Sequence, residues 1–231
     1  MDRGIWALGY ELPVEHAAEY LHWFHHVQIP DLLSRPGYVW AAHYALGHGS
    51  PGNGYLALFG GVTAHSFLSR ISGQLGQQPR AARDRMLAMR RNSFTYILAE
   101  ETRVDGPDVG MRDADGTPGP VIQIGNYNAA SPAVEEDLGA WYAQQRLPLL
   151  ASLPGCVGAR KMLATVGAYK HAIVHEFVSL ELRERHFGPH EAEARDPGTW
   201  MGRVRPQLTH APHSPAIGTR VWPPSHPAGN H

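Results

Sequence analysis

The chain has 231 residues, 43% of them hydrophobic, so a folded protein of this length buries a substantial core. Its 20 Lys and Arg side chains nearly balance its 21 Asp and Glu side chains, which argues against nucleic acid or an anionic membrane as the main partner. A single cysteine, Cys156, excludes an intrachain disulfide framework. No apolar run approaches the roughly 20 residues of a membrane helix and no secretory signal is present, so the sequence predicts a cytoplasmic protein.

The first half of the sequence predicts strands separated by helices. A strand over 4–11 precedes an amphipathic helix over 14–34, which ends at a Pro-Gly stop signal. The elements predicted next are strands over 38–46 and 55–60, helical stretches over 64–76 and 81–91, and a closing strand over 93–104.

The second half repeats this order after a segment rich in Gly, Pro and Asp, which predicts a linker. The predicted elements are strands over 120–128, 156–164, 169–179 and 218–222, a helix over 133–152, and helical stretches over 180–194 and part of 198–208. The predicted domains are residues 1–104 and 121–222, with the linker at 105–120 and an irregular tail at 223–231.

An internal repeat supports this division. Residues 23–44 align without a gap with residues 141–162, and eight of the 22 positions are identical, among them Trp23 with Trp141 and the Pro-Gly pairs. The order β-α-β-β-α-β in each copy is that of a ferredoxin-like module. Such a module leaves one sheet face bare, so two modules bury both faces by packing the sheets together. The predicted fold is α+β, a pseudo-dimeric α/β barrel within one chain.

The pattern of Trp-aromatic, Pro, Leu and Pro-Gly before a strand resembles the EthD-like family of the dimeric α/β-barrel superfamily, most clearly over 20–46 and 138–164. The resemblance implies the barrel fold and only a broad range of activities. Superfamily members include cofactor-free monooxygenases, polyketide cyclases, lactone isomerases and haem enzymes such as chlorite dismutase. EthD-like sequences commonly carry a histidine two residues before the mid-helix proline, where this chain has Gln28 and Arg146. The family's general base is therefore not carried over.

Helical periodicity points to a polar pocket. At about 100° per residue, Gln28 lies on the sheet-facing stripe of the first helix, and Tyr142 and Arg146 take the corresponding places in the second. A buried polar group is costly unless paired, so these positions indicate a pocket between helix and sheet. The alternative is that Gln28 and Arg146 lie at a helix end kinked by proline and reach solvent. Trp23 and Trp141 lie roughly opposite this stripe, where they could form a contact between modules or chains, unless the proline kink turns them inward.

The histidines of the first helix allow two interpretations. His22, His25 and His26 have the spacing with which a helix face can hold a metal, but no HExxH pattern is present and His22 and His26 point away from the core stripe. We expect no metal, surface positions for most of these rings, and His25 as the one that could border the pocket. The loop at 47–54 lacks the Lys and helix of a phosphate loop, and His210, His213, His226 and His231 are expected in solvent.

Strand alternation supplies the remaining candidates. His43 lies on one face of its strand, and Trp40 and Tyr44 lie on the other. His171 and His175 share a face that could line a ligand cavity or, as the slightly favoured interpretation, form the interface between the two sheets. Tyr96 on the closing strand of the first half is a possible hydroxyl donor, or an ordinary strand tyrosine.

The main functional hypothesis is an enzyme acting on a small organic molecule without a bound cofactor, by isomerisation, cyclisation, lyase chemistry or oxygenation. The proposed catalytic residues are His25, His43 and Tyr96. The proposed substrate-binding residues are Gln28, Trp40, Tyr44, Tyr142, Arg146, His171 and His175. The alternative is a non-catalytic ligand-binding or structural duplication, and the third hypothesis is a haem protein with His171 or His175 as axial ligand. Monomer and homodimer both remain open.

Overall fold

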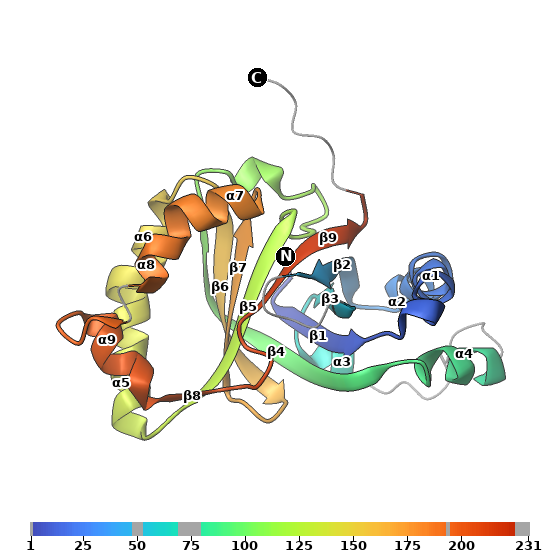
Figure 1. Cartoon of the computed structure of the whole chain (residues 1–231), viewed down its shortest axis with the longest axis horizontal. Coiled ribbons are helices and arrows are strands. Elements are labelled where there is room, and N and C mark those ends of the chain that lie inside the picture. The colour runs from blue at the N-terminus through green and yellow to red at the C-terminus, as the bar shows by residue number, and fades with distance from the viewer. Residues whose placement is uncertain (1, 48–52, 69–79, 193–194, 225–231) are drawn as a thin grey trace.

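The computed structural model describes residues 2–47, 53–68, 80–192 and 195–224, and its strands form a closed eight-stranded antiparallel barrel with helices on two sides (Figure 1). Around the barrel the order is β7-β6-β4-β1-β3-β2-β9-β5, and β5 pairs again with β7. The short β8 pairs with β5 beyond the ring. The strands are β1 (Gly4–Glu11), β2 (Tyr38–Leu46), β3 (Gly54–Gly61), β4 (Arg91–Asp105), β5 (Val121–Ala129), β6 (Cys156–Val166), β7 (His171–Phe177), β8 (Leu208–His210) and β9 (Ala216–Trp222). The α+β prediction is confirmed.

Each half of the chain contributes four neighbouring strands, and the halves join along two seams. One seam pairs β4 with β6, and the other pairs β2 with β9. β4 has 15 residues, which lets its first part pair with β1 and its second part with β6. The strands therefore form one closed sheet, in which the edges of the two four-stranded halves are hydrogen-bonded together, and the division into two modules stays a prediction.

Side chains from alternate strand positions fill the barrel interior. Inward-facing residues of both halves form one apolar cluster that includes Ile5, Ala7, Trp40, Tyr44, Tyr96, Leu98, Ile122, Ile124, Met162 and Val174. Because a strand turns successive side chains to opposite faces, the intervening residues point outward, toward the helices. The barrel thus separates two helix–sheet layers on its outer surface.

The first layer covers β1, β2 and β3, and the second covers β5, β6 and β7. The helices of the first layer are α1 (Val14–Trp23), η1 (Phe24–Gln28), α2 (Ile29–Leu33), α3 (His65–Leu68) and α4 (Arg80–Leu87). Those of the second layer are α5 (Pro132–Trp141), η3 (Tyr142–Arg146), α6 (Leu147–Ser152), α7 (Leu180–Leu182), η4 (Arg183–Phe187), α8 (Gly188–Ala192) and α9 (Trp200–Val204). No helix among the described residues is long and apolar enough to span a membrane.

A π-helical turn interrupts the main helix of each layer at matching positions, 24–28 and 142–146. A π turn takes in one extra residue, so residues on the two sides of it face the sheet with a spacing of five rather than four. Trp23 and Trp141 are consequently buried, at 8% and 7% exposure, as are Gln28 and Arg146. The expected outward position of the two tryptophans is wrong because regular helical periodicity does not include this turn.

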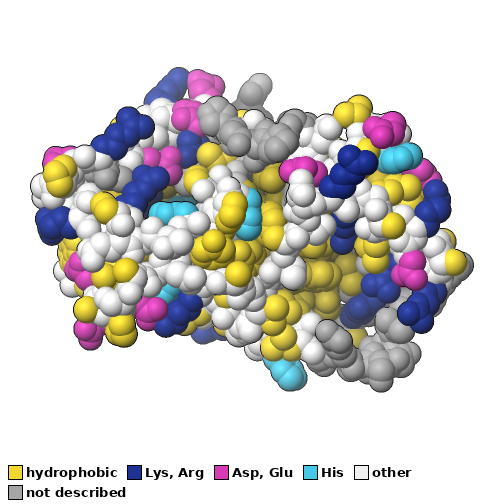
Figure 2. Space-filling model, turned by 60° about the horizontal axis from the view of Figure 1, so that its bottom comes forward, with side chains coloured by type: hydrophobic (Ala, Val, Ile, Leu, Met, Phe, Trp, Pro, Cys, Tyr) yellow, Lys and Arg dark blue, Asp and Glu magenta, His cyan; other side chains and the backbone are white. Residues whose placement is uncertain are grey.

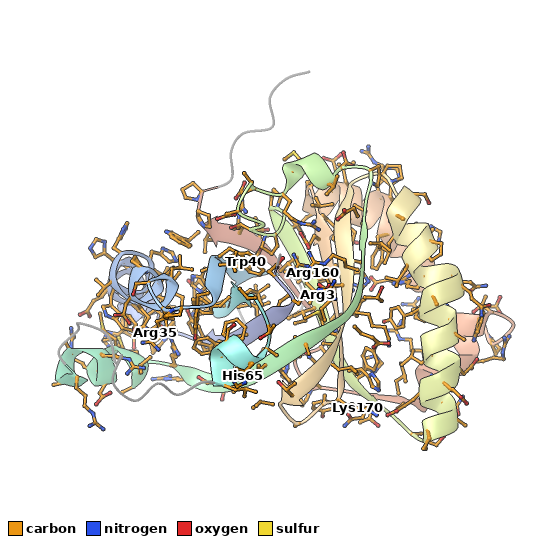
Figure 3. The ribbon with its side chains drawn as sticks, turned by 180° about the vertical axis from the view of Figure 1, so that it is seen from behind. Arg3, Arg35, Trp40, His65, Arg160 and Lys170 are labelled. Carbon is orange, nitrogen blue, oxygen red and sulfur yellow. The ribbon has the colours of Figure 1, made fainter. Side chains whose placement is uncertain are left out.

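The predicted linker has a fixed structure that closes one end of the barrel. It contains the 3₁₀ turn η2 (Val109–Met111), and Arg112 donates two hydrogen bonds to the buried carboxylate of Glu176 on β7. At the same end of the barrel, Asp2 accepts hydrogen bonds from Trp40 and Arg160. The side chains of Trp40 and Arg160 lie near each other, in the middle of the whole molecule (Figure 3). Burial alone would raise the pKa of Asp2, but the charge and hydrogen bonds of Arg160 hold it below its ordinary value.

Within the described residues, the predicted elements agree with the observed ones except in the last third of the chain. The helix over 14–34 is observed as α1, η1 and α2, and that over 133–152 as α5, η3 and α6. β8 was not predicted. Residues 48–52 of the predicted 47–54 loop, residues 69–76 of the helical stretch predicted over 64–76, and His226 and His231 lie outside the described part of the chain.

Candidate active site

A cavity of about 350 Å³ lies in the second layer, between the helices and the outer face of β5 and β7. This volume falls within the range of small-molecule sites, near its lower end. The polar groups around it come from the strands, the π turn and the chain after α9, and the apolar ones come mainly from α5 and α9. The lining residues are Gln123, Gly125, Tyr127, Leu138, Trp141, Tyr142, Arg146, Ile173, His175, Glu191, Met201, Val204, Arg205, Leu208, His210, Ser214 and Pro215.

The π turn places aromatic and cationic side chains on the cavity wall. Tyr127 donates a hydrogen bond of 3.1 Å to the hydroxyl of Tyr142. The guanidinium carbon of Arg146 lies 4.4 Å from the ring centre of Phe187 and 5.5 Å from that of Trp141, so the cation is held between aromatic faces. Arg146 is 5% exposed, and this burial makes its charge more effective than it would be in water.

His175 is the buried acid–base group of the cavity. Its side chain is 2% exposed and packs against Phe187 and Phe177. Neither ring nitrogen makes a hydrogen bond of ordinary geometry with a described residue. Burial lowers the pKa of His175 well below its ordinary value, and the charges of Arg146 and Arg183 lower it further. The imidazole is therefore neutral at neutral pH and able to accept a proton.

Gln123, Arg183 and Glu191 form a hydrogen-bonded group beside His175. The amide oxygen of Gln123 accepts bonds from Arg183 Nε (2.9 Å) and Nη2 (2.6 Å), and its amide nitrogen donates to Glu191 Oε1 (2.9 Å). The other carboxylate oxygen of Glu191 accepts from Arg183. Gln123 and Glu191 both reach the cavity, but their polar atoms are oriented by Arg183 behind them, which makes this wall rigid.

The segment after α9 completes the cavity. His210 on β8 lines it together with Ser214 and Pro215, and the pKa of His210 is lowered by burial and by the charge of Arg205. His213 stacks on Phe94, with ring centres 3.5 Å apart. The expectation that His210 and His213 lie in solvent is wrong, because this segment packs against the barrel. On one face of the molecule, apolar side chains gather between the charged ends, with histidines at their edge (Figure 2).

The corresponding space in the first layer is filled by a hydrogen-bonded chain of aromatic side chains. Tyr10 Oη lies 2.8 Å from His43 Nε2, and His43 Nδ1 lies 2.8 Å from His25 Nε2. His43 is fully buried, whereas His25 is partly exposed and stacks on Trp222. Burial lowers the pKa of His43 well below its ordinary value, and burial together with His26 lowers that of His25 to about 4. The structure thus joins His25 and His43, and supplies Tyr10, which sequence reasoning missed.

The other predicted site residues separate into three places. Trp40, Tyr44 and Tyr96 lie inside the barrel, on the opposite sheet face from His43, and do not reach the cavity. His171 and His175 face the helices rather than the sheet interface, which corrects the favoured interpretation of that strand. Gln28 is buried in the first layer, and Tyr142, Arg146 and His175 line the cavity.

Other lining residues could have been found from the sequence, at least in part. Gln123 is a polar residue in the apolar run VIQIG and shares a face with Gly125 and Tyr127. That pattern is a usable signal for a polar wall. Ser214 and Pro215 carried no signal, because their Pro-rich surroundings predict an irregular tail.

A metal ion and haem are two groups that histidines of these sites could bind. In the described part of the chain, no three His, Cys, Asp or Glu side chains are placed to hold a metal ion; His22 and His26, with ring centres 4.7 Å apart, form only a pair. His175 offers the kind of nitrogen that binds haem iron. A porphyrin with its propionates, however, is considerably larger than the molecules that a cavity of about 350 Å³ holds. The residues present therefore do not fit haem, and fit a smaller molecule.

Comparison with known proteins places the fold. No family model matches the chain, and no curated protein matches its sequence. An anthrone oxidase-like protein is similar in structure, with a TM-score of 0.61 and 13% identity over 95% of this chain and 92% of that one. A provisionally named monooxygenase from Lactobacillus acidophilus NCFM has a TM-score of 0.58 and 10% identity over 95% and 94%. A chlorite dismutase mutant from Candidatus Nitrospira defluvii, in complex with cyanide, has a TM-score of 0.52 and 12% identity over 95% and 92%. The chain thus shares its overall fold with these proteins.

Proposed function

We propose that this chain is an enzyme that acts on a small organic molecule in the cavity of the second layer, without a bound cofactor. The observation that carries the proposal is His175, a buried neutral imidazole on the wall of a cavity of small-molecule size, whose ring nitrogens make no hydrogen bond of ordinary geometry with a described residue. A buried titratable group with a shifted pKa in a cavity is a typical feature of catalytic sites. Oxygenation and isomerisation both begin with removal of a proton from the substrate, and both suit this arrangement.

His175 would act as general base, accepting a proton from an acidic O–H or C–H of the substrate. Its low pKa in the empty site makes it a weak base. The negative charge that forms on the substrate compensates for this, because an adjacent anion raises the pKa of an imidazolium. Arg146 would stabilise that charge, and the hydroxyl pair of Tyr127 and Tyr142 would supply a polar contact for the substrate.

The proposal differs from the sequence hypothesis in which residues are assigned. His25 and His43 do not line the cavity, and Tyr96 lies inside the barrel. Their catalytic role stays a hypothesis for a separate site in the first layer. Tyr142, Arg146 and His175 keep the role that the sequence hypothesis gave them, and His175 also takes over the acid–base function.

The test is turnover of a panel of phenols, naphthols, enolisable 1,3-diketones and unsaturated lactones in aerated buffer, followed by mass spectrometry. For any substrate found, His175→Gln is expected to lower kcat/KM by about 10²–10⁴-fold. His171→Gln on the same strand face is the matched control, because His171 does not line the cavity. Turnover unchanged in His175→Gln contradicts the assignment, and no turnover across the panel favours the alternative of a non-catalytic binding protein. A haem absorption band in the purified protein overturns the cofactor-free proposal.

We also propose that the two halves arose by tandem duplication of one ferredoxin-like module, as in the EthD-like proteins that the sequence resembles. The eight identical positions and the π turns at the same spacing support this origin. Each half has the strand order fourth, first, third, second, as a ferredoxin-like sheet has. Separate expression of residues 1–104 and 121–222 tests the domain boundaries: two fragments that reassemble into a folded complex support them.

A further inference from the structure

The described side chains that line the cavity include two arginines and one carboxylate. Arg146 brings a buried positive charge to the wall, and Arg205 brings a second, exposed one. Among the described residues that line the cavity, the carboxylate is that of Glu191. Both of its oxygens are engaged, one by Gln123 and one by Arg183, so its charge is compensated from behind the wall.

The arginines around the cavity lower the pKa values of its histidines. Positive neighbours lower the pKa of His175 and of His210, in addition to the effect of burial. Arg146 also acts on Tyr127 and Tyr142, where its charge lowers the pKa against the larger effect of burial. Four groups from β5, η3, β7 and β8 thus experience a positive charge from the arginines around the cavity.

The shape and apolar lining define the rest of the ligand. Trp141, Tyr142 and Tyr127 present aromatic rings, and Leu138 and Ile173 add aliphatic surface. Such walls favour a flat, largely apolar body. Arginine binds a carboxylate through two parallel hydrogen bonds, which suits an anionic group attached to that body.

We infer that the cavity takes a small planar organic anion, an aromatic carboxylate or phenolate, whose charged group lies against Arg146 and whose ring lies among Trp141, Tyr142 and Tyr127. This inference rests on the proposed function, since it names the substrate class of the same cavity. The bound anion would lie close enough to His175 to return its pKa toward the ordinary value, which prepares the base once the substrate is present.

The experiment measures binding without turnover. Benzoate and benzamide are titrated into the full-length protein by calorimetry; they have nearly the same shape and differ in charge. Benzoate is expected to bind at least tenfold more tightly. Arg146→Gln is expected to abolish that preference, and Arg146→Lys to retain part of it. Arg203→Gln, at an exposed position of α9 that does not line the cavity, is the control and is expected to change affinity less than threefold. Thermal unfolding of each variant establishes that it is folded.

A second readout uses the histidine side chain itself. On addition of benzoate, the His175 ring resonances in NMR are expected to titrate at higher pH, whereas benzamide leaves them unchanged. Equal affinities for the two compounds, no binding of either, or an unchanged preference in Arg146→Gln would each overturn the inference. So would competition by inorganic phosphate as strong as that by benzoate, because it would indicate a site for any anion. Preferential binding of benzoate without turnover of any compound would leave the inference standing and remove the proposed enzyme activity.

Discussion

The two helix–sheet layers have the same framework and different contents. In the first, Tyr10, Tyr20, Phe24, His43 and Tyr55 pack together and fill the space between helix and sheet. In the second, smaller or displaced side chains leave a cavity of about 350 Å³. The difference teaches that this fold accommodates either a filled or an open layer, because the barrel interior has an apolar cluster of its own.

Single positions account for much of the difference. Leu8 and Gly125 each lie two residues before a tyrosine that faces the helices, Tyr10 in the first layer and Tyr127 in the second. Leu8 fills space that Gly125 leaves open. Phe24 is matched by Tyr142 and Phe59 by His175, so an apolar ring in one layer is replaced by a polar group in the other.

The largest expected difference between the layers is in the loss of stability when the side chains at one pair of matching positions, Phe24 and Tyr142, are truncated to alanine. Phe24→Ala is expected to lower the free energy of unfolding by about 3–5 kcal/mol, because it opens a void in a filled layer. Tyr142→Ala at the matching position is expected to cost about 1–3 kcal/mol, because that side chain already borders a cavity. Urea unfolding measures both values. Equal losses would mean that the second layer is closed in solution.

Filling the cavity should remove its function and leave the fold intact. Gly125→Leu adds a side chain where a Cβ would meet Ile173 and Ser214 at ordinary contact distances of 3.4 and 3.5 Å. Binding of benzoate and turnover of any substrate are expected to fall at least 100-fold, which corresponds to about 2.7 kcal/mol. Gly110→Leu, in open space, is the control. Retained binding in a folded Gly125→Leu protein would place the site elsewhere.

Removal of one tyrosine hydroxyl from each layer should lower stability more in the filled first layer than beside the cavity of the second layer. Tyr10→Phe leaves His43 Nε2 buried without its partner, at a cost of about 1–3 kcal/mol. Tyr127→Phe removes a bond to Tyr142 beside the cavity, where water can replace it, and is expected to cost less than about 1 kcal/mol. Thermal unfolding of the two variants at pH 8 makes the comparison. A larger loss for Tyr127→Phe would contradict it.

The smallest expected effect is the pH dependence from His25. The unfolded chain binds a proton on His25 near pH 6.5 and the folded protein only near pH 4, so this residue lowers stability as the pH falls through that interval. Below about pH 4 its effect levels off, and above about pH 6.5 it is absent. A shift of this size in a fully buried ring corresponds to about 3 kcal/mol, and partial exposure reduces this to about 1–2 kcal/mol.

The matching measurement is the free energy of unfolding between pH 4 and 8 for the natural protein and for His25→Asn. The slope of stability against pH should be shallower in the variant. Parallel curves would show that the contact between His25 and His43 does not persist in solution. Loss of His25 should not alter benzoate binding in the other layer, which makes binding a control for the integrity of the fold.

The sequence predicted the α+β class and most element boundaries because hydrophobic periodicity and Pro-Gly stops are local signals. It did not predict that Trp23 and Trp141 are buried, because it assumed regular α-helical periodicity. A single π turn changes which side of the helix the preceding residues lie on. The alternation of side chains along the strand correctly placed Trp40 and Tyr44 on one face and His43 on the other. It could not show which of the two faces would form the barrel interior. That information comes from pairing between distant strands, such as β2 with β9.

The candidate site was predictable only in part. Arg146 and Tyr142 follow from the repeat, and His175 from strand alternation. His210 and Ser214 lie in a segment whose composition predicts irregular chain, and only tertiary packing brings them to the cavity. Tyr10 escaped notice because nothing local in its strand connects it to His43, 33 residues later.

The two seams of the barrel also set the order in which the protein can be completed during synthesis. β2 and β4 leave the ribosome with open edges, and their partners β9 and β6 come from the second half of the chain. At about 5–20 residues per second, the remaining residues take roughly 6–23 s to be made. Until β6 has been made the first half has unpaired edges on both β2 and β4, and until β9 has been made the edge of β2 stays unpaired. A chaperone or a slow pause at residues 105–120 would matter most in this interval.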